Sequence, residues 1–263
     1  MEIKVLGTVS PKCFENKNCP GYLIIEENNL IMLDCGNGVS KYIKSTDMEK
    51  LTIIISHLHH DHYGDLLSLA YDSYVLHNVG LLQHKIPVYI PKPDLTKSTE
   101  TVEINLNTYN FLTNLGEENY LEFRFYDEND KLNIGDVKID FSRNPHQIPT
   151  YSIRAKKNNQ IVVYSGDTGY KNNTLREFSE NADLLICEST YLKGQTRKKD
   201  YHLYAHEAAE IAKTAKVRQL VLTHFYPEID KKLYVNEAKE IFENTASAEE
   251  GKVLKLGGIK WKN

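Results

Sequence analysis

The feature that most constrains this chain is a run of six residues, His57-Leu58-His59-His60-Asp61-His62. It directly follows Leu51–Ile55, an apolar run typical of a buried β-strand. Alternate histidines that leave the end of a strand can point toward one metal ion, and the Asp61-His62 pair can reach a second. Imidazole and carboxylate ligands together suit zinc, and also manganese or iron. Histidines also cluster by chance in surface loops, but ligand-type residues at this spacing behind a strand favour a metal site.

The remaining ligands are expected at the ends of other strands. Further apolar runs each end on a potential ligand with a turn-forming residue beside it: Val137–Phe141 before His146, Ile161–Tyr164 before Asp167, and Leu220–Leu222 before His224. One such coincidence would carry little weight. Together with the first run, they supply two balanced sets of ligands, so the sequence predicts a two-metal site.

The ordered motifs resemble those of the metallo-β-lactamase superfamily. They are Leu33-Asp34-Cys35-Gly36, the H-x-H-x-D-H run, His146, Asp167 and His224, so the resemblance covers nearly the whole chain. It implies an α/β fold, a four-layer αββα sandwich, that binds two divalent metal ions, with zinc favoured over manganese or iron. It also implies one ligand set for each ion: His57, His59 and His146 for the first, Asp61, His62 and His224 for the second, with Asp167 bridging the two.

The same resemblance makes Asp34 a buried carboxylate behind the ligands. Such a group orients imidazole ligands and holds their tautomers. Asp34 can also simply close a strand into the Gly36–Gly38 turn. The two roles are compatible, and both stay open at this point.

A second group of motifs resembles the ribonuclease Z branch of this superfamily. An apolar run ends at Glu188-Ser189-Thr190, and His202 then precedes a predicted helix. In that branch a glutamate and a histidine outside the metal sets assist phosphodiester cleavage, and by position they match Glu188 and His202. His206 is expected to face outward along the helix and receives no role. A loop histidine that merely begins the helix is the alternative for His202.

This resemblance implies a division of catalytic roles. Two cations lower the pKa of a water molecule toward about 7, so hydroxide becomes available at neutral pH. Asp61 would hold that hydroxide in line with the scissile bond. His202, fixed by Glu188, would donate a proton to the leaving alkoxide. Asp61, Glu188 and His202 are therefore the expected catalytic residues.

The chain departs from bacterial ribonuclease Z in one place. Those enzymes carry a long arm between the residues that match His146 and Asp167, and they use it to grip transfer RNA. Here Gln147–Gly166 suffices only for two strands and a turn at Lys156–Asn159. The chain resembles an arm-less relative, and we expect it to act on a small phosphodiester or a nucleic acid.

Two other classes of function remain open. A lactone or thioester hydrolase could use the same two metal sets, although acyl hydrolysis does not need the Glu188–His202 pair. A binding or redox module that has lost hydrolysis is the other class. Redox relatives replace the second histidine of the motif by glutamate, whereas His59 is present here.

Composition agrees with a cytoplasmic hydrolase. The formal net charge of −4 gives no general basic surface for nucleic acid, although Lys156-Lys157 and Arg197–Lys199 are local basic runs, more typical of solvated loops. No signal peptide or membrane span is expected, and a homodimer is left open. Two of the 4 cysteines, Cys13 and Cys19, flank a polar loop and could pair or bind a metal.

The strands are expected in two groups within one domain, residues 1–263, because the ligands are spread along most of the chain. The first group is Ile3–Leu6, Tyr22–Ile25, Leu30–Leu33, Ile53–Ile55 and Val88–Ile90. The second group is Glu122–Phe125, Val137–Phe141, Tyr151–Ala155, Ile161–Tyr164, Leu184–Cys187 and Leu220–Leu222. Apolar stripes predict helices after the metal motif, after His202 and near Val235. Polar Pro91–Asn119 is expected to be an insertion or a lid.

Overall fold

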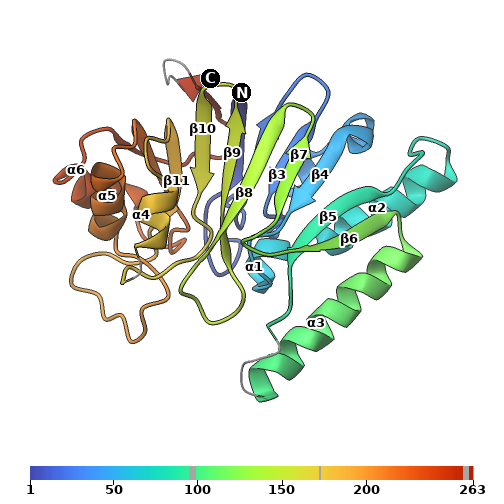
Figure 1. The fold of residues 1–263 in the computed structure, drawn as a ribbon, viewed down its shortest axis with the longest axis horizontal. Coiled ribbons are helices and arrows are strands. Elements are labelled where there is room, and N and C mark those ends of the chain that lie inside the picture. The colour runs from blue at the N-terminus through green and yellow to red at the C-terminus, as the bar shows by residue number, and fades with distance from the viewer. Residues whose placement is uncertain (95–98, 172, 257–260, 263) are drawn as a thin grey trace.

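Strands that are apolar on both faces decide the architecture. The computed structural model describes residues 1–94, 99–171, 173–256 and 261–262. Two mixed sheets pack face to face, and helices cover their outer sides (Figure 1). No helix in these ranges combines the length and apolar character needed to cross a membrane.

The first sheet carries the metal motif. In spatial order it contains β15 (Trp261–Lys262), β14 (Val253–Lys255), β1 (Glu2–Gly7), β2 (Gly21–Ile25), β3 (Leu30–Leu33), β4 (Leu51–Ile54), β5 (Ile86–Pro91) and β6 (Leu121–Tyr126). Strands β3 to β6 are parallel, and the others pair antiparallel. The parallel part directs the carboxyl ends of β3 and β4 to the same edge.

The second sheet supplies the other ligands. It contains β13 (Thr245–Ser247), β12 (Gln219–Thr223), β11 (Leu184–Glu188), β10 (Gln160–Tyr164), β9 (Tyr151–Lys157), β8 (Val137–Arg143) and β7 (Lys131–Ile134). Strands β7 to β10 form an antiparallel meander, and β10 to β13 are parallel. Strands β8, β10, β11 and β12 therefore run in one direction and end at one edge.

The helices lie in two outer layers. They are α1 (His60–Tyr63), α2 (Leu66–Asn78), α3 (Thr99–Glu118), α4 (Thr174–Phe178), α5 (Ala205–Thr214) and α6 (Lys231–Lys239), with short 3-10 helices η1 (Ser40–Tyr42) and η2 (Ser45–Lys50). Buried residues of α2 and α3, among them Leu69 and Leu112, pack on the first sheet. Ile211 of α5 and Tyr234 of α6 pack on the second.

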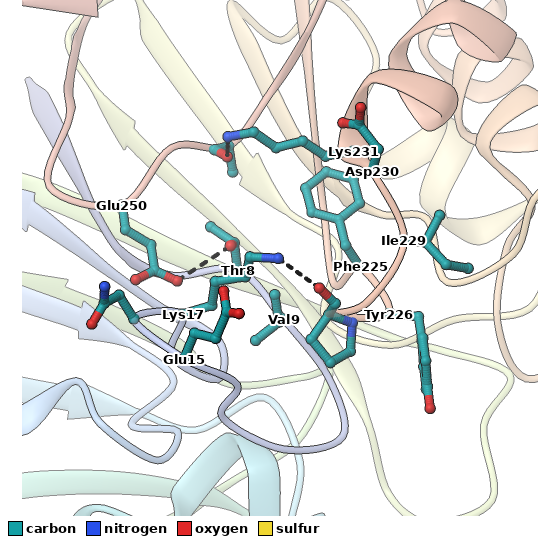
Figure 2. A pocket seen from close by; sticks show the side chains of 13 residues that line it. Thr8, Val9, Glu15, Lys17, Phe225, Tyr226, Ile229, Asp230, Lys231 and Glu250 are labelled. Carbon is teal, nitrogen blue, oxygen red and sulfur yellow. Dashed lines mark hydrogen bonds between the residues drawn. The ribbon is translucent and has the colours of Figure 1, made fainter.

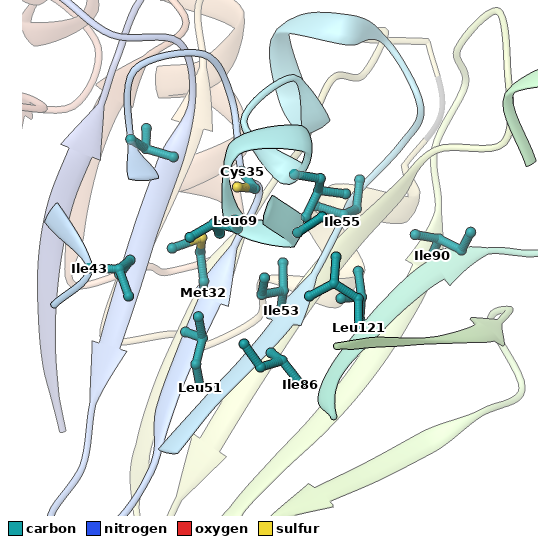
Figure 3. Packing of buried hydrophobic residues seen from close by; sticks show 14 of the residues in the cluster. Met32, Cys35, Ile43, Leu51, Ile53, Ile55, Leu69, Ile86, Ile90 and Leu121 are labelled. Carbon is teal, nitrogen blue, oxygen red and sulfur yellow. The ribbon is translucent and has the colours of Figure 1, made fainter. Parts of the chain in front are cut away.

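Neighbouring residues of single strands belong to different cores. Met32 and Ile53 pack in the outer layer with Leu69, as Figure 3 shows, whereas Leu33 and Ile54 pack between the sheets. Successive side chains of a strand point to opposite faces, so both faces of β3 and β4 are covered. The predicted four-layer αββα sandwich is confirmed.

Two expectations about the chain between β5 and β7 are wrong. Glu122–Phe125 was expected in the second group, but β6 pairs in parallel with β5 at the edge of the first sheet. A parallel pair needs a crossover connection, which is usually a helix. Pro91–Asn119 supplies it: β5 ends at Pro91 and α3 leads into β6, so the segment is a crossover and not an insertion. The alternative of a lid stays a prediction. Residues 95–98 lie outside the described ranges.

One glycine lets the loop after β3 pack closely against α1, which carries part of the metal motif. A Cβ atom on Gly36, which follows β3, would lie 2.2 Å from the carbonyl oxygen of Asp61. On either side of that contact, Cys35 donates its backbone N–H to His62 at 2.8 Å and accepts one from Asp65 at 3.0 Å. Only glycine permits this close approach, which holds α1 against the end of β3.

Candidate metal centre

Strand ends from both sheets converge at one edge of the sandwich. The His57–His62 run follows β4 of the first sheet. His146, Asp167 and His224 follow β8, β10 and β12 of the second sheet, which run in the same direction. All seven predicted ligands gather there in groups that could hold metal ions.

The first ligand set joins three imidazoles to Asp167. His59 Nδ1 lies 3.0 Å from His57 Nε2 and 3.1 Å from His146 Nε2. Asp167 Oδ2 lies 3.5 Å from His57 Nε2 and 3.8 Å from His146 Nε2. His57, His146 and Asp167 are buried, and His59 is half-buried. Four donor atoms thus face one small volume.

The second ligand set lies on the other side of Asp167. His62 Nε2 and His224 Nε2 are 3.3 Å apart, and each lies 3.6 Å from Asp61 Oδ2. The other carboxylate oxygen of Asp167, Oδ1, lies 3.5 Å from His62 Nε2 and 3.2 Å from His224 Nε2. Asp167 therefore directs one oxygen to each set.

The Asp167 carboxylate tests whether this pocket fits metal ions. Its Oδ1 atom is buried and has no hydrogen-bond partner among the residues that the structure describes. An unpaired buried carboxylate oxygen is strongly unfavourable unless a cation or a donor reaches it. Nitrogen and carboxylate donors at this spacing meet the preferences of zinc and other divalent metals. The donor set fits two divalent cations.

Hydrogen bonds behind the ligands fix which ring nitrogen faces the centre. At Nδ1, His57 contacts Ser56 Oγ at 3.0 Å, His62 contacts Asp34 Oδ2 at 2.6 Å, His146 contacts the Tyr201 carbonyl at 3.0 Å, and His224 contacts Thr190 Oγ1 at 2.9 Å. A carbonyl or carboxylate only accepts, so His62 and His146 carry a proton on Nδ1. The hydroxyls of Ser56 and Thr190 donate to Asp34 and Glu188, so they too accept from Nδ1–H, of His57 and His224. The Nε2 lone pairs then face the centre. His59, by contrast, presents Nδ1.

Asp34 fills both roles left open by the sequence. It has φ +58° at the end of β3, and it is fully buried. Its Oδ1 accepts the backbone N–H of Ser56 at 2.6 Å, and its Oδ2 accepts the hydroxyls of Ser56 at 2.8 Å and Tyr164 at 2.6 Å. The carboxylate therefore closes the strand and also holds the ring of His62.

Burial and nearby charge divide the histidines into two kinds. Burial lowers the pKa of His57 and His59 and lowers that of His146 to about 3, so these rings are neutral, as metal ligation requires. Burial also opposes protonation of His62, but the charges of Asp167 and Asp61 outweigh it and raise the pKa to about 10. The carboxylates thus attract positive charge, and a metal ion would replace that proton.

Glu188 and His202 lie beside both ligand sets. Glu188 ends β11 and is buried; its Oε1 lies 3.1 Å from His202 Nδ1, and it also accepts the backbone N–H of Leu203 at 3.1 Å. The His202 ring stacks on His224 at 5.4 Å between centroids and meets His146 edge-on at 5.1 Å. Its side chain is 24% exposed, so a substrate can reach it.

Other candidate groups have partners outside the centre. His206 Nδ1 lies 2.7 Å from Glu237 Oε1. Arg197 donates to the His202 carbonyl at 2.8 Å and pairs with Glu207, so it braces the loop before α5. Cys13 and Cys19 are free thiols with their sulfur atoms 3.9 Å apart.

A cavity of ≈ 340 Å³ has Phe225, Lys17 and Glu250 among its lining residues and none of the seven ligands (Figure 2). Glu250 accepts two hydrogen bonds of 2.8 Å from Asn18, and Lys17 donates to the Pro227 carbonyl. These polar groups are engaged within the protein. The chemistry therefore belongs to the ligand sets.

Sequence reasoning missed several supporting residues. Ser10 Oγ donates to Asp61 Oδ2 at 2.7 Å, and Asn144 Nδ2 donates to the Asp167 carbonyl at 2.9 Å. Nothing in the residues around Ser10 or Tyr164 signals their roles. Ser56 and Thr190, in contrast, stand next to motif residues, and their hydroxyls could have been considered.

The comparisons with known proteins agree with this fold and site. The model of the Beta-lactamase superfamily domain matches residues 29–225. The chain belongs to the metallo-β-lactamase superfamily and is a hydrolase of that superfamily.

Individual relatives span nearly the full chain. A probable metallo-hydrolase, YhfI of Bacillus subtilis (strain 168), is 29% identical over 85% of this chain and 86% of its own length. The crystal structure of YhfI superposes with a TM-score of 0.84 at 28% identity, covering 96% of this chain and 98% of that one. Ribonuclease Z of Thermococcus sibiricus is 29% identical over 92% of each chain. Human tRNase Z, short form, shares the fold, with a TM-score of 0.71 at 20% identity over 97% of this chain and 99% of that one.

The geometry predicts two divalent ions per chain. Asp167→Ala is expected to weaken the binding of both ions because Asp167 faces both sets. His224→Ala should weaken chiefly the binding of one ion. Elemental analysis of metal-saturated protein would measure this, with His206→Ala as a matched control that removes an imidazole outside both sets. One ion or none in the unchanged protein would refute the two-metal assignment. Loss of the same single ion in both variants would refute the division of ligands.

Proposed function

We propose that this chain is a dinuclear-metal phosphodiesterase that cleaves nucleotide or RNA phosphodiester bonds. The observation that carries the proposal is the Glu188–His202 pair, 3.1 Å apart beside two ligand sets. A phosphodiester whose leaving group is an alkoxide needs a proton donor at that position. Relatives named ribonuclease Z support the same chemistry.

The ligand sets would hold the two cations. His57, His59 and His146 would bind the first and Asp61, His62 and His224 the second, with Asp167 shared; we propose zinc, and manganese or iron would suit the same donors. When bound, such cations supply Lewis acidity, which lowers the pKa of water toward about 7 and offsets negative charge on phosphate oxygens.

Asp61 would orient the attacking water. His62 and His224 outweigh the effect of burial and lower the pKa of Asp61, so its carboxylate is ionised and can accept a hydrogen bond from water. Ser10 holds the same carboxylate oxygen from behind at 2.7 Å. The nucleophile would thus be held in line with the leaving group.

His202 would be the proton donor. Burial opposes its protonated form, but the charges of Glu188 and Asp167 outweigh burial and raise the pKa to about 9, which favours a proton on the ring. Asp167, His202 and His224 could also form a metal group. We assign the acid role because Nδ1 of His202 lies closer to Glu188, at 3.1 Å, than to Asp167, at 3.8 Å.

The substrate would be small. Only the β9–β10 hairpin joins the ends of β8 and β10, and the net charge is −4. Long-range binding of nucleic acid depends on contacts between cations and phosphates, which this chain offers sparsely. A single domain over residues 1–263 and a cytoplasmic location remain predictions from the sequence.

His202→Ala should keep both metal ions and reduce turnover of a phosphodiester with an alkoxide leaving group by about 10²–10⁴-fold, the usual contribution of a general acid. It should matter much less for a nitrophenolate leaving group, which leaves without a proton. His206→Ala is the control, because it removes an imidazole that contacts Glu237 and neither ligand set. Equal losses on both substrates would mean that His202 binds the substrate and is not the acid.

Small phosphodiesters should be hydrolysed in preference to precursor transfer RNA. Zinc- and manganese-loaded protein would be assayed at moderate salt with activated phosphodiesters, cyclic nucleotides, short RNA and precursor transfer RNA, alongside lactones and thioesters. Efficient trimming of a transfer-RNA 3′ end would contradict the small-substrate part. Brisk lactone or thioester hydrolysis without phosphodiester turnover would overturn the phosphodiesterase proposal.

We also propose that the outer face of α2 joins two copies of this chain. Exposed apolar side chains lie along α2 and in the turn after it: Leu67, Tyr71, Tyr74, Val75, Val79 and Leu81. From Leu66 to Leu82 the only Asp, Glu, Lys or Arg is Asp72. A segment without Lys or Arg does not attract nucleic acid or anionic lipid, whereas a second copy meets it with little charge repulsion. These side chains expose roughly 500 Å² against the ~800 Å² that each partner of a standard interface contributes.

Light scattering during size-exclusion chromatography should give twice the chain mass for the unchanged protein. Tyr71→Glu should give a monomer because it buries a charge in the interface. Tyr226→Glu, at an exposed tyrosine elsewhere, should leave the dimer intact. A monomer throughout the micromolar range would refute the dimer, and dissociation by Tyr226→Glu alone would refute the choice of face.

A further inference from the structure

The hydroxyl of Thr190 contacts groups from both parts of the proposed active site. Thr190 follows β11 by two residues. Its Oγ1 lies 2.9 Å from Glu188 Oε2 and 2.9 Å from His224 Nδ1. The same oxygen lies 3.3 Å from His202 Nδ1. One atom therefore touches the carboxylate of the acid pair, its imidazole, and a ligand of the second metal set.

The hydrogen-bond directions follow from what each group can donate. A hydroxyl has one proton, and an ionised carboxylate only accepts, so Thr190 donates to Glu188. The lone pairs of Thr190 Oγ1 then accept the Nδ1–H of His224. With its proton on Nδ1, His224 presents Nε2 to the centre, where it lies 3.3 Å from His62 Nε2. The chain of donors runs from His224 through Thr190 to Glu188.

We propose that Thr190 is a positioning residue that links the second metal ligand set to the Glu188–His202 proton donor. The inference rests on the proposed function. Thr190 holds the tautomer of His224 that binds an ion and also holds the carboxylate that orients His202. His224 has φ +62°, a backbone conformation that a non-glycine residue rarely adopts and that persists only where surrounding contacts hold it.

Removal of the hydroxyl leaves the rest of the loop in place. The backbone N–H of Thr190 still reaches Glu188 Oε2 at 3.0 Å, and Glu188 Oε1 keeps the backbone N–H of Leu203. Thr190→Val is almost the same size as threonine. Its effects should therefore arise from the lost hydroxyl bonds, with His224 Nδ1–H deprived of its acceptor.

The first measurement needs no substrate. Cobalt(II) titration of the full chain, followed by its visible spectrum, should show two binding steps. Thr190→Val should weaken chiefly one of them, by about 10–100-fold, as is typical when the partner behind a metal-bound histidine is removed. Thr190→Ser, which keeps the hydroxyl, should restore the affinity.

The second measurement uses the two leaving groups on zinc-loaded protein. Thr190→Val should lower kcat for an alkoxide leaving group more than kcat for a nitrophenolate, with KM little changed, and Thr190→Ser should reverse the loss. Thr223→Val is the matched control, because it removes a buried hydroxyl next to His224 that bonds Tyr22 and touches neither the acid pair nor a ligand. It should keep both metal steps and the leaving-group dependence.

The outcomes separate this inference from the proposed function. Unchanged cobalt affinities in Thr190→Val, or equal losses on both leaving groups, would overturn the link. Failure of Thr190→Ser to restore either property would show that the hydroxyl alone does not carry the effect, and it would also overturn the link. If the unchanged protein cleaves no phosphodiester, the proposed function fails, and the cobalt titration still decides whether Thr190 supports His224.

Discussion

The Asp167 carboxylate is the interaction on which the rest of this centre depends. It is buried between two groups of imidazoles, and one of its oxygens has no hydrogen-bond partner among the described residues. A buried carboxylate of this kind is stable only beside positive charge. The raised pKa of His62 has the same cause, because the surrounding carboxylates favour a positive charge at this position. The edge of the sandwich is therefore built to hold cations.

Hydrogen bonds from residues behind the ligands fix the orientation of the imidazole rings. Asp34 and Ser56 hold two rings from the first sheet, and Thr190 holds one from the second. Asp34 and His224 both adopt positive φ, which places strain beside the functional groups. Such strain persists only where the surroundings determine the conformation, and here both sheets supply partners. Gly36 contributes by allowing β3 to approach the metal motif.

Membership of the metallo-β-lactamase superfamily identifies the chain as a hydrolase. The groups outside the metal sets bear on which kind of bond it would cleave. The same ligand sets can serve acyl or phosphoryl transfer. A buried glutamate that holds a half-buried histidine beside both sets favours a reaction whose leaving group requires a proton. The short β9–β10 hairpin and the acidic net charge point to substrates that bind at the centre itself.

The sequence by itself determined the strand ends and the residues placed on them. An apolar run followed by a ligand is a local pattern, so His57, His146, Asp167 and His224 could be read without a structure. It did not determine that β6 joins the first sheet, because that pairing depends on the crossover by α3. Only the tertiary structure decided the partners behind the ligands, such as Ser10 for Asp61 and Tyr164 for Asp34. Ser10 and Asp61 are 51 positions apart and follow β1 and β4 of the first sheet, whereas Asp34 and Tyr164 are 130 positions apart and belong to different sheets. Both contacts form only when distant segments pack, which no local pattern encodes.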